Sequence, residues 1–337
     1  MSYSITLEPN GLQFECSESE TLIEAGQRVD IRFPVSCRNG VCHICRAELI
    51  QGRIETRTGE LVSPNDTNEI YVCHVKPHTD VTIYMDGVLG PGELPMNTFS
   101  CQIKQVSEMQ AHVYKVVLEQ PAGKLKEFYA GQYLALLLPE REDETYFSIA
   151  SAPNQREIEL HIQADPHLEK ALEVVQFLQT SASVQVKLPF GKACLSSVPS
   201  EPVLLLAAGT GFAQMKSLIE YLLGNGFDKE LSLYWTARKE SDLYALDYVK
   251  DLEDRYENVH IQTIVADDDQ VQSQSTQHHS LLADAVLEGH GDLSRFKVFV
   301  AGSPRMVYSA MDALEDAGLE HENFYSDVLE YVSRDQI

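Results

Sequence analysis

Long apolar runs are missing from this 337-residue chain. No stretch approaches the ~18 uninterrupted apolar residues that a membrane-spanning helix needs. The opening residues, MSYSITLEPNGLQF, also lack the basic start and apolar centre of a secretory signal. We therefore expect a cytoplasmic protein with no membrane insertion.

Basic residues are scarce, with 26 Lys and Arg against 51 Asp and Glu and a formal net charge of −25. A charge of this sign repels nucleic-acid backbones and anionic lipid headgroups. Nucleic acid is therefore not expected as a partner. The same acidity can serve solubility or guide docking to a basic protein, and composition leaves both open.

A disulfide framework is not expected either, because the chain has only seven cysteines and no secretory signal. Four of the cysteines cluster by spacing. The other three, Cys16, Cys101 and Cys194, stand alone, and we expect them to be buried as small hydrophobic residues.

Glycine and proline gather in one stretch, 87–97, which has no apolar period and is typical of a linker. Before it, alternating runs on both sides of Asn10-Gly11 predict a β-hairpin. A short helix is predicted over 18–28 from its Ser/Thr start and its apolar spacing.

After the linker, strand-like runs separated by turns predict a small antiparallel barrel over 98–195, interrupted by a helix at 167–180. From 200 to 337, buried apolar strands alternate with amphipathic helices, which predicts a doubly wound parallel sheet. A polar segment at 267–279 is expected to be a solvated loop. The chain is thus predicted to form three domains, 1–90, 98–195 and 200–337.

The four clustered cysteines have a distinctive spacing. Cys37, Cys42 and Cys45 follow the pattern C-x4-C-x2-C, and Cys73 comes later in YVCHV. This is the ligand spacing of plant-type [2Fe–2S] clusters, and Gly40 supplies a permissive backbone in the loop. Structural zinc is the alternative, but zinc sites usually pair two C-x2-C spacings and only one is present.

A second motif lies in LLLAAGTGFAQMKSLI, where a buried strand, a glycine turn and a helix follow one another. This is the context of a phosphate-binding loop. Gly209 and Gly211 let the backbone approach a cofactor, and Thr210 can donate its hydroxyl.

Further segments complete a resemblance to a known family: FYAGQYLALLL, TYFSIA, VFVAGSPRM and FYSDVLEYV. Residues 1–90 resemble a chloroplast-type ferredoxin domain, and the whole chain resembles the ferredoxin-NADP reductase superfamily. The cluster-first order is similar to the reductase components of bacterial phenol, toluene and methane monooxygenases and to CDP-6-deoxy-glucoseen reductase. From about residue 100 onward, the chain is most similar to the NAD(P)H-flavin reductase of enteric bacteria.

The resemblance implies a multidomain fold. Its parts would be an α+β ferredoxin-like (β-grasp) domain, an antiparallel β-barrel flavin domain and an α/β doubly wound nicotinamide domain. It also implies that Phe147 lies against the flavin ring, that Ser148 reaches its N5 atom and that Asp327 orders the active site.

The chain departs from the family pattern at several positions. His43 replaces a glycine of the cluster loop, Thr145 replaces the arginine that binds the flavin phosphates, Gln214 replaces a proline, and Ala301 replaces a cysteine. The Gly-x-x-Ser phosphate turn is also absent from ADPHLEK. Losing the arginine weakens FAD binding by roughly tenfold to a hundredfold unless another group replaces it. The candidates for that replacement are Lys126, Arg141, His161 and His167.

For the nicotinamide cofactor, Arg238 favours NADPH, but Asp242 adds negative charge where a 2′-phosphate would sit, so NADH is predicted. The predicted cofactor-binding residues are Gln132, Tyr133, Thr145, Tyr146, Phe147, Ser148, Ile149, Gly209, Thr210, Gly211, Arg238, Gly302, Ser303, Pro304 and Met306. The predicted catalytic residues are Ser148 and Asp327, and the predicted metal ligands are Cys37, Cys42, Cys45 and Cys73.

These expectations together describe a monomeric NADH-dependent iron-sulfur flavoprotein reductase. Hydride transfer delivers two electrons and the cluster accepts one, so FAD, expected to be loosely held, would stand between them. The acceptor would be an oxygenase, desaturase or dehydrase partner. The alternative is an NAD(P)H-flavin reductase that releases reduced flavin, and a third is a redox-sensing or scaffold protein without enzyme activity.

Overall fold

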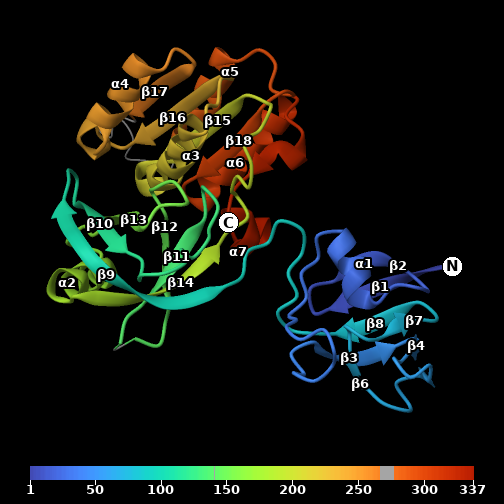
Figure 1. Ribbon diagram of the computed structural model, residues 1–337. Coiled ribbons are helices and arrows are strands. Elements are labelled where there is room, and N and C mark those ends of the chain that lie inside the picture. The colour runs from blue at the N-terminus through green and yellow to red at the C-terminus, as the bar shows by residue number, and fades with distance from the viewer. Residues whose placement is uncertain (140, 266–276) are drawn as a thin grey trace. The chain divides into compact units, whose positions relative to one another are not determined.

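The computed structural model describes residues 1–139, 141–265 and 277–337. It divides into two compact units, Met1–Pro95 and Met96–Ile337, so the division falls within the predicted linker (Figure 1). The C-terminal unit contains both an antiparallel and a parallel sheet. The predicted boundary near residue 200 therefore lies inside one compact unit, and the three-domain division stays a prediction.

The N-terminal unit is built on a five-stranded mixed sheet in the order β2-β1-β8-β3-β6, with a second sheet in the order β5-β4-β7. The predicted hairpin pairs β1 and β2, and β1 also pairs in parallel with β8. With one helix packed on the sheet, this is the β-grasp arrangement. Its strands are β1 (Ser2–Glu8), β2 (Leu12–Ser17), β3 (Arg46–Gln51), β4 (Ile54–Glu55), β5 (Leu61–Val62), β6 (Glu69–Tyr71), β7 (Lys76–Pro77) and β8 (Val81–Tyr84).

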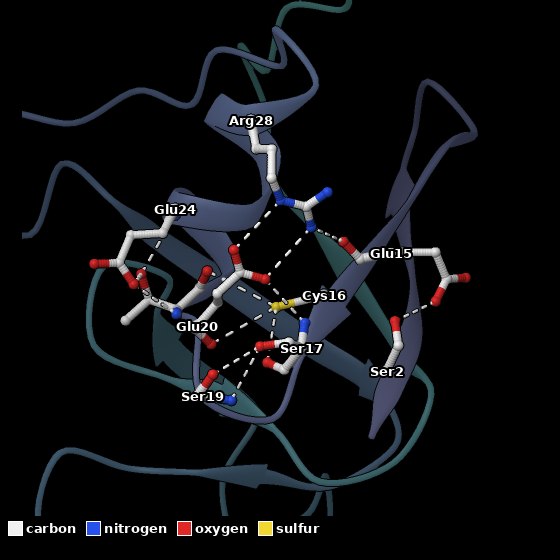
Figure 2. Close-up of polar contacts among 9 residues, drawn as sticks. Ser2, Glu15, Cys16, Ser17, Ser19, Glu20, Glu24 and Arg28 are labelled. Carbon is white, nitrogen blue, oxygen red and sulfur yellow. Dashed lines mark hydrogen bonds and ion pairs between the residues drawn. The ribbon is translucent and has the colours of Figure 1, made fainter.

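Helix α1 (Leu22–Arg28) is fixed at both ends. At its start, Thr21 and Glu24 cap each other's backbone amides. At its end, Arg28 donates to the backbone oxygen of Glu15 on β2 at 2.8 Å (Figure 2). Cys16 is fully buried in the same region, as predicted. The helix is thereby held on the sheet immediately before the cysteine loop.

The C-terminal unit begins with a six-stranded antiparallel sheet in the order β12-β11-β14-β9-β10-β13. A bridge between Ile149 and Leu160 joins the two edges and nearly closes the sheet into a barrel. The predicted helix is present as α2 (Glu169–Thr180), and Cys101 is fully buried in the barrel core. The strands are β9 (Asn97–Glu108), β10 (Val113–Glu119), β11 (Tyr133–Leu137), β12 (Thr145–Ser148), β13 (Glu157–Gln163) and β14 (Ser183–Phe190).

The second sheet of this unit is wholly parallel, in the order β17-β16-β15-β18-β19. Alternate residues of β15 enter different cores: Leu205 packs with Phe212 of α3, whereas Leu204 packs with residues of α5 and α6. Both faces of the sheet are therefore covered by helices, which is the doubly wound arrangement. The strands are β15 (Val203–Ala208), β16 (Leu231–Ala237), β17 (Val259–Val265), β18 (Lys297–Ala301) and β19 (Phe324–Tyr325).

The α-helices that accompany this sheet are α3 (Phe212–Gly224), α4 (Leu246–Arg255), α5 (Gln277–Gly289), α6 (Pro304–Asp316) and α7 (Val328–Tyr331). Residues 267–276 of the predicted loop lie outside the described residues. Its last three residues, 277–279, belong instead to α5, which begins at Gln277. No helix within the described ranges is both long and apolar enough to cross a membrane.

Candidate functional site

The four cysteines predicted as cluster ligands come together in the N-terminal unit. Three lie in the loop between α1 and β3, and Cys73 follows β6. The Cys45 and Cys73 sulfurs are 3.2 Å apart, and the Cys42 amide donates to the Cys37 sulfur at 3.3 Å. Among the described residues, no three His, Cys, Asp or Glu side chains converge tightly enough for a single metal ion.

Backbone amides of the loop surround the first of these sulfurs. Hydrogen bonds from the Asn39 amide, from Cys42 and from the Val41 amide lower the pKa of Cys37 to about 6. Amide donors of this kind stabilise a negatively charged thiolate. These donors suit Cys37 to an anionic cluster held by thiolates, which would supply one-electron transfer at this position when bound. Burial and the neighbouring Cys45 instead raise the pKa of the Cys73 thiol to about 11.

Gly40 is the residue that allows the loop to take this shape. Its φ is +76°, and a Cβ at this position would lie 2.5 Å from the Cε1 atom of His74. The Gly40 amide also donates to Cys73. A larger residue would therefore displace an amide donor from a ligand sulfur, which explains the glycine predicted here.

The backbone conformation at His43 explains why a glycine is favoured at this position. His43 has a φ of +60°, a left-handed conformation that favours glycine. Its ring packs on Tyr71 with ring centroids 4.8 Å apart, and its Nδ1 atom lies 3.1 Å from the Tyr71 hydroxyl. These contacts help to offset the cost of the left-handed backbone at His43.

A second site is a cavity of about 850 Å³ in the C-terminal unit. Three kinds of segment line it: the ends of barrel strands, the turns after parallel strands β15 and β18, and the C-terminal segment around α7. In Figure 1, α7 lies beside β11 and β14. The lining residues include Tyr133, Tyr146, Phe147, Ser148, Phe190, Thr210, Gly211, Gly302, Ser303, Asp327 and Tyr331.

The cavity thus gathers most of the predicted cofactor residues, although they lie far apart in the sequence. Its barrel wall is aromatic. Tyr133 stacks on Phe190 with centroids 5.5 Å apart, and Tyr146 meets the Phe190 ring edge-on at 5.3 Å. Thr210 and Gly211, in the turn at the end of β15, also line the cavity. A planar aromatic ligand beside a phosphate-bearing one suits such a site.

The remaining predicted residues lie outside the cavity lining. Gln132 is buried and donates to the Gly191 carbonyl at 2.9 Å, so it supports the turn before β11. Ile149 and Met306 are buried in cores. The others that do not line the cavity are Thr145, Gly209, Arg238 and Pro304.

The cavity offers no fixed cation to a phosphate. Within the described ranges, none of its lining residues is lysine or arginine. Arg141 is paired with Asp143 at 2.6 Å. His161 lines the cavity, but its two ring nitrogens contact Tyr244 at 2.9 Å and Glu159 at 2.8 Å. Arg141, Lys126 and His167 do not line the cavity, and both ring nitrogens of His161 already have partners, so the structure places none of the predicted substitutes to bind a phosphate there.

Some lining residues were not predicted from the sequence. Phe190 ends β14 and Tyr331 ends α7, and only the folding of distant segments brings them to the cavity. No local pattern distinguishes Phe190 and Tyr331 from ordinary core or surface positions.

The isolated cysteine Cys194 was expected to be buried and is only partly buried.

Asp327 is the one carboxylate that lines the cavity among the described residues. Its Oδ1 atom accepts the Ala193 amide at 3.0 Å, and its Oδ2 atom accepts the Gln214 side chain at 3.0 Å. Burial raises the pKa of Asp327 to about 6, and the negative charge of Glu330 acts in the same direction. A proton can thus bind or leave this site near neutral pH.

Replacing Asp327 by asparagine should change how stability depends on pH. An unfolded aspartate titrates near pH 4, about two units below the folded value, so ionising the buried group costs on the order of 3 kcal/mol. The contribution of Asp327 to wild-type stability should therefore fall as pH rises from 4 to 6. The variant has no carboxyl group to ionise at this position. Between pH 4 and 6, its free energy of unfolding should therefore rise relative to that of wild type by on the order of 3 kcal/mol, and above pH 6 the difference should level off.

Urea unfolding between pH 4 and 8, followed by fluorescence of Trp235, checks this prediction. Trp235 is the chain's single tryptophan and is buried in the C-terminal unit. Asp228→Asn is the control, because that aspartate is exposed in the same unit and should show no such rise. Parallel curves for wild type and Asp327→Asn would contradict the assignment.

Comparison with known proteins gives two matches to family models. Residues 5–78 match a 2Fe-2S iron-sulfur cluster binding domain, and residues 205–312 match an oxidoreductase NAD-binding domain. The first span contains all four clustered cysteines, and the second contains the glycine turn.

Similar curated proteins extend over nearly the whole chain. The reductase component 1 of terephthalate 1,2-dioxygenase from Comamonas sp. is 27% identical over 97% of both chains. The CDP-6-deoxy-L-threo-D-glycero-4-hexulose-3-dehydrase reductase of Yersinia pestis is 26% identical over 97% of this chain and 98% of its own. The NAD(P)H-flavin reductase of Vibrio harveyi is 29% identical over 70% of this chain and all of its own. Among solved structures, a cytochrome P450 reductase from Amycolatopsis matches with a TM-score of 0.63 and 20% identity, over 96% of this chain and 98% of that one.

Proposed function

This chain belongs to the ferredoxin-NADP reductase superfamily and carries an N-terminal [2Fe–2S] ferredoxin domain, and from that premise we propose that it is the reductase component of an oxygenase or dehydrase system. It is an NAD(P)H-dependent oxidoreductase with a flavin and a [2Fe–2S] cluster. Electrons enter from the nicotinamide, pass to the flavin and the cluster, and leave to a protein acceptor.

One observation carries the proposal: a single cavity is lined both by aromatic residues of the barrel and by the glycine turn of the parallel sheet. A bound flavin would accept a hydride there and release electrons singly. Tyr133, Phe147 and Ser148 would hold and orient the ring system. The turn at Gly209–Gly211 would bind the nicotinamide nucleotide's phosphates with backbone amides.

We assign NADH rather than NADPH as the electron donor. Arg238 and Lys239 follow β16, where adenosine ribose contacts fall in this fold. Glu240 and Asp242 follow at once, and the Asp242 carboxylate accepts the Lys239 amide at 3.2 Å. Two carboxylates close to the two basic residues leave little net positive charge to attract a 2′-phosphate.

The acceptor is proposed to be a redox protein, because relatives of full length are named as reductase components of a dioxygenase and of a dehydrase. A desaturase fits the same chemistry. We further propose that the protein works as a monomer in the cytoplasm.

A second candidate function is release of reduced flavin to solution. Two observations favour it: the cavity lining in the described ranges has no lysine or arginine, and the similarity to a flavin reductase covers the whole of that relative. The two functions differ in how long flavin stays bound.

Purification followed by spectroscopy separates them. In the reductase component, flavin stays at one per chain through gel filtration, and anaerobic NADH bleaches both flavin and cluster absorption. In the flavin reductase, only the cluster absorbs after gel filtration, and activity returns with added FAD. An FAD-replete protein whose spectrum does not respond to NADH would refute both.

Replacing Thr145 by arginine should tighten FAD binding by roughly tenfold to a hundredfold, because it returns the charge-assisted phosphate contact that the family pattern has at this position, next to the cavity residue Tyr146. Quenching of FAD fluorescence on titration with apoprotein measures the dissociation constant. Thr98→Arg is the matched control: it adds the same charge at an exposed strand position in the same sheet and should leave the constant unchanged. Equal tightening in both variants would show a nonspecific charge effect.

A further inference from the structure

One buried side chain joins several segments that meet at the cavity. Gln214, in the first turn of α3, is only 4% exposed. Its Nε2 atom lies 2.8 Å from the Gly131 carbonyl, 3.2 Å from the Ala193 carbonyl and 3.0 Å from Asp327 Oδ2. All of these partners are acceptors, so only the amide nitrogen can face them, and the orientation of the amide is fixed.

These contacts form a closed ring. Gln214 shares its two amide hydrogens among Gly131, Ala193 and Asp327, and the Ala193 amide donates in turn to Asp327 Oδ1 at 3.0 Å. The contact with Gly131 adds the turn that leads to Tyr133 on the cavity wall. One amide therefore connects the helix after the glycine turn, the barrel and the C-terminal segment.

The family resemblance places a proline at this position. A proline has no polar side-chain atom and could make none of these contacts. The ring is thus a property of the glutamine in this chain and not of the family pattern.

The surroundings of Asp327 make the amide contact important. The groups that face the carboxylate are Glu330 and Tyr331 of α7, Tyr133 of β11 and Cys194, together with the Lys192 and Ala193 amides. No cationic side chain pairs with Asp327 in the part of the chain that the structure describes. Its charged form therefore depends on the few N–H donors around it, and Gln214 is the only side chain among them.

We propose that Gln214 is a positioning residue, which aims the Asp327 carboxylate into the cavity and fixes the nucleotide-binding helix α3 to the barrel turn at Gly131. This inference rests on the proposed function, because it assumes that the flavin and nicotinamide meet in this cavity. It assigns to Gln214, which itself lines the cavity, a role in hydride transfer that acts through Asp327.

The direct test measures the pH midpoint at which Asp327 ionises in the full chain. The signal is the infrared carboxyl band that is present in wild type and absent from Asp327→Asn. Gln214→Leu removes the donor at similar volume, and the carboxyl midpoint should rise by about one pH unit, a tenfold change in the ionisation constant. Gln214→Glu keeps the size and shape of the side chain, and its added carboxylate should raise the midpoint at least as far.

Gln120→Leu is the matched control. Gln120 is equally buried, at 3% exposed, and accepts the Lys126 amide at 2.8 Å in a part of the barrel that does not line the cavity. It should leave the Asp327 midpoint unchanged. If the midpoint stays at the wild-type value in both Gln214 variants, or moves equally in Gln120→Leu, the proposal is wrong. Should Gln214→Leu fail to fold, Gln214→Glu decides alone.

A second measurement links the ring to hydride transfer. In FAD-replete protein, the pH profile of flavin reduction by NADH should shift in the Gln214 variants by the same amount as the infrared midpoint. An infrared shift with an unmoved kinetic profile would overturn the catalytic part of the proposal. If wild-type flavin is not reduced by NADH at all, the proposed function fails, and the infrared titration still tests the positioning of Asp327.

Discussion

Replacing Cys42 by serine should lower NADH-driven reduction of cytochrome c by at least about a hundredfold while ferricyanide reduction stays near the wild-type rate. Mutating residues that merely support metal ligands already costs 10–100-fold, so loss of a ligand costs more. Ferricyanide is small and can take electrons at the flavin cavity, whereas cytochrome c is expected to take them from the cluster. The two acceptors therefore report the two ends of the proposed relay.

Cys16→Ser is the control for this experiment. Cys16 lies in the same unit and is fully buried, but it is not in the cluster loop, and its sulfur contacts the Ser17 and Glu20 carbonyls at 3.6 Å (Figure 2). Both activities and the cluster spectrum should persist in this variant. Equal loss of both activities in Cys42→Ser would show that the cluster precedes the flavin or that the chain has unfolded, and would overturn the electron order.

Local signals predicted the parts of the molecule that depend on neighbouring residues. The cysteine loop follows from its spacing, the first hairpin from Asn10-Gly11, and the glycine turn from the strand and helix on either side of it. Each of these features is a short stretch whose backbone conformation is dictated within about ten residues.

Features that depend on distant contacts were not predictable in this way. Gln214 stood out in the sequence only as a departure from a family pattern, and its partners Gly131 and Asp327 lie 83 and 113 residues away. Arg141 was a reasonable candidate for binding phosphate until the structure showed it paired with Asp143. The polarity of a side chain can be read from the sequence, but which partner satisfies it depends on the fold.

His43 shows the same limit at a single residue. The sequence identified it as a replacement for glycine and left its effect open. The structure shows that its backbone keeps the left-handed conformation and that Tyr71, 28 residues away, supplies the compensating contact. The contact that supports an unusual backbone conformation can therefore come from a residue far away in the sequence.

Replacing Gly211 by alanine should lower the rate of flavin reduction by NADH by about a hundredfold, the cost expected when reacting groups are displaced by about 1 Å. A Cβ on Gly211 would lie 2.4 Å from the backbone oxygen of Ala301, which belongs to β18 and cannot move without disturbing the sheet. Helix α3 and the turn before it would have to shift away from β18. The nicotinamide nucleotide would then be held away from the flavin, while the cluster loop in the N-terminal unit is unchanged.

Stopped-flow measurement in FAD-replete protein gives the rate of flavin reduction. Reduction of the cluster by dithionite should stay at the wild-type level, which would show that the N-terminal unit is intact. Gly224→Ala is the matched control, since Gly224 ends the same helix and a Cβ there meets no atom within 4 Å. Its rate should remain within about twofold of wild type, because the new methyl group displaces nothing. A wild-type rate in Gly211→Ala would mean that the turn does not hold the nucleotide, and equal slowing in both variants would trace the effect to helix α3 as a whole.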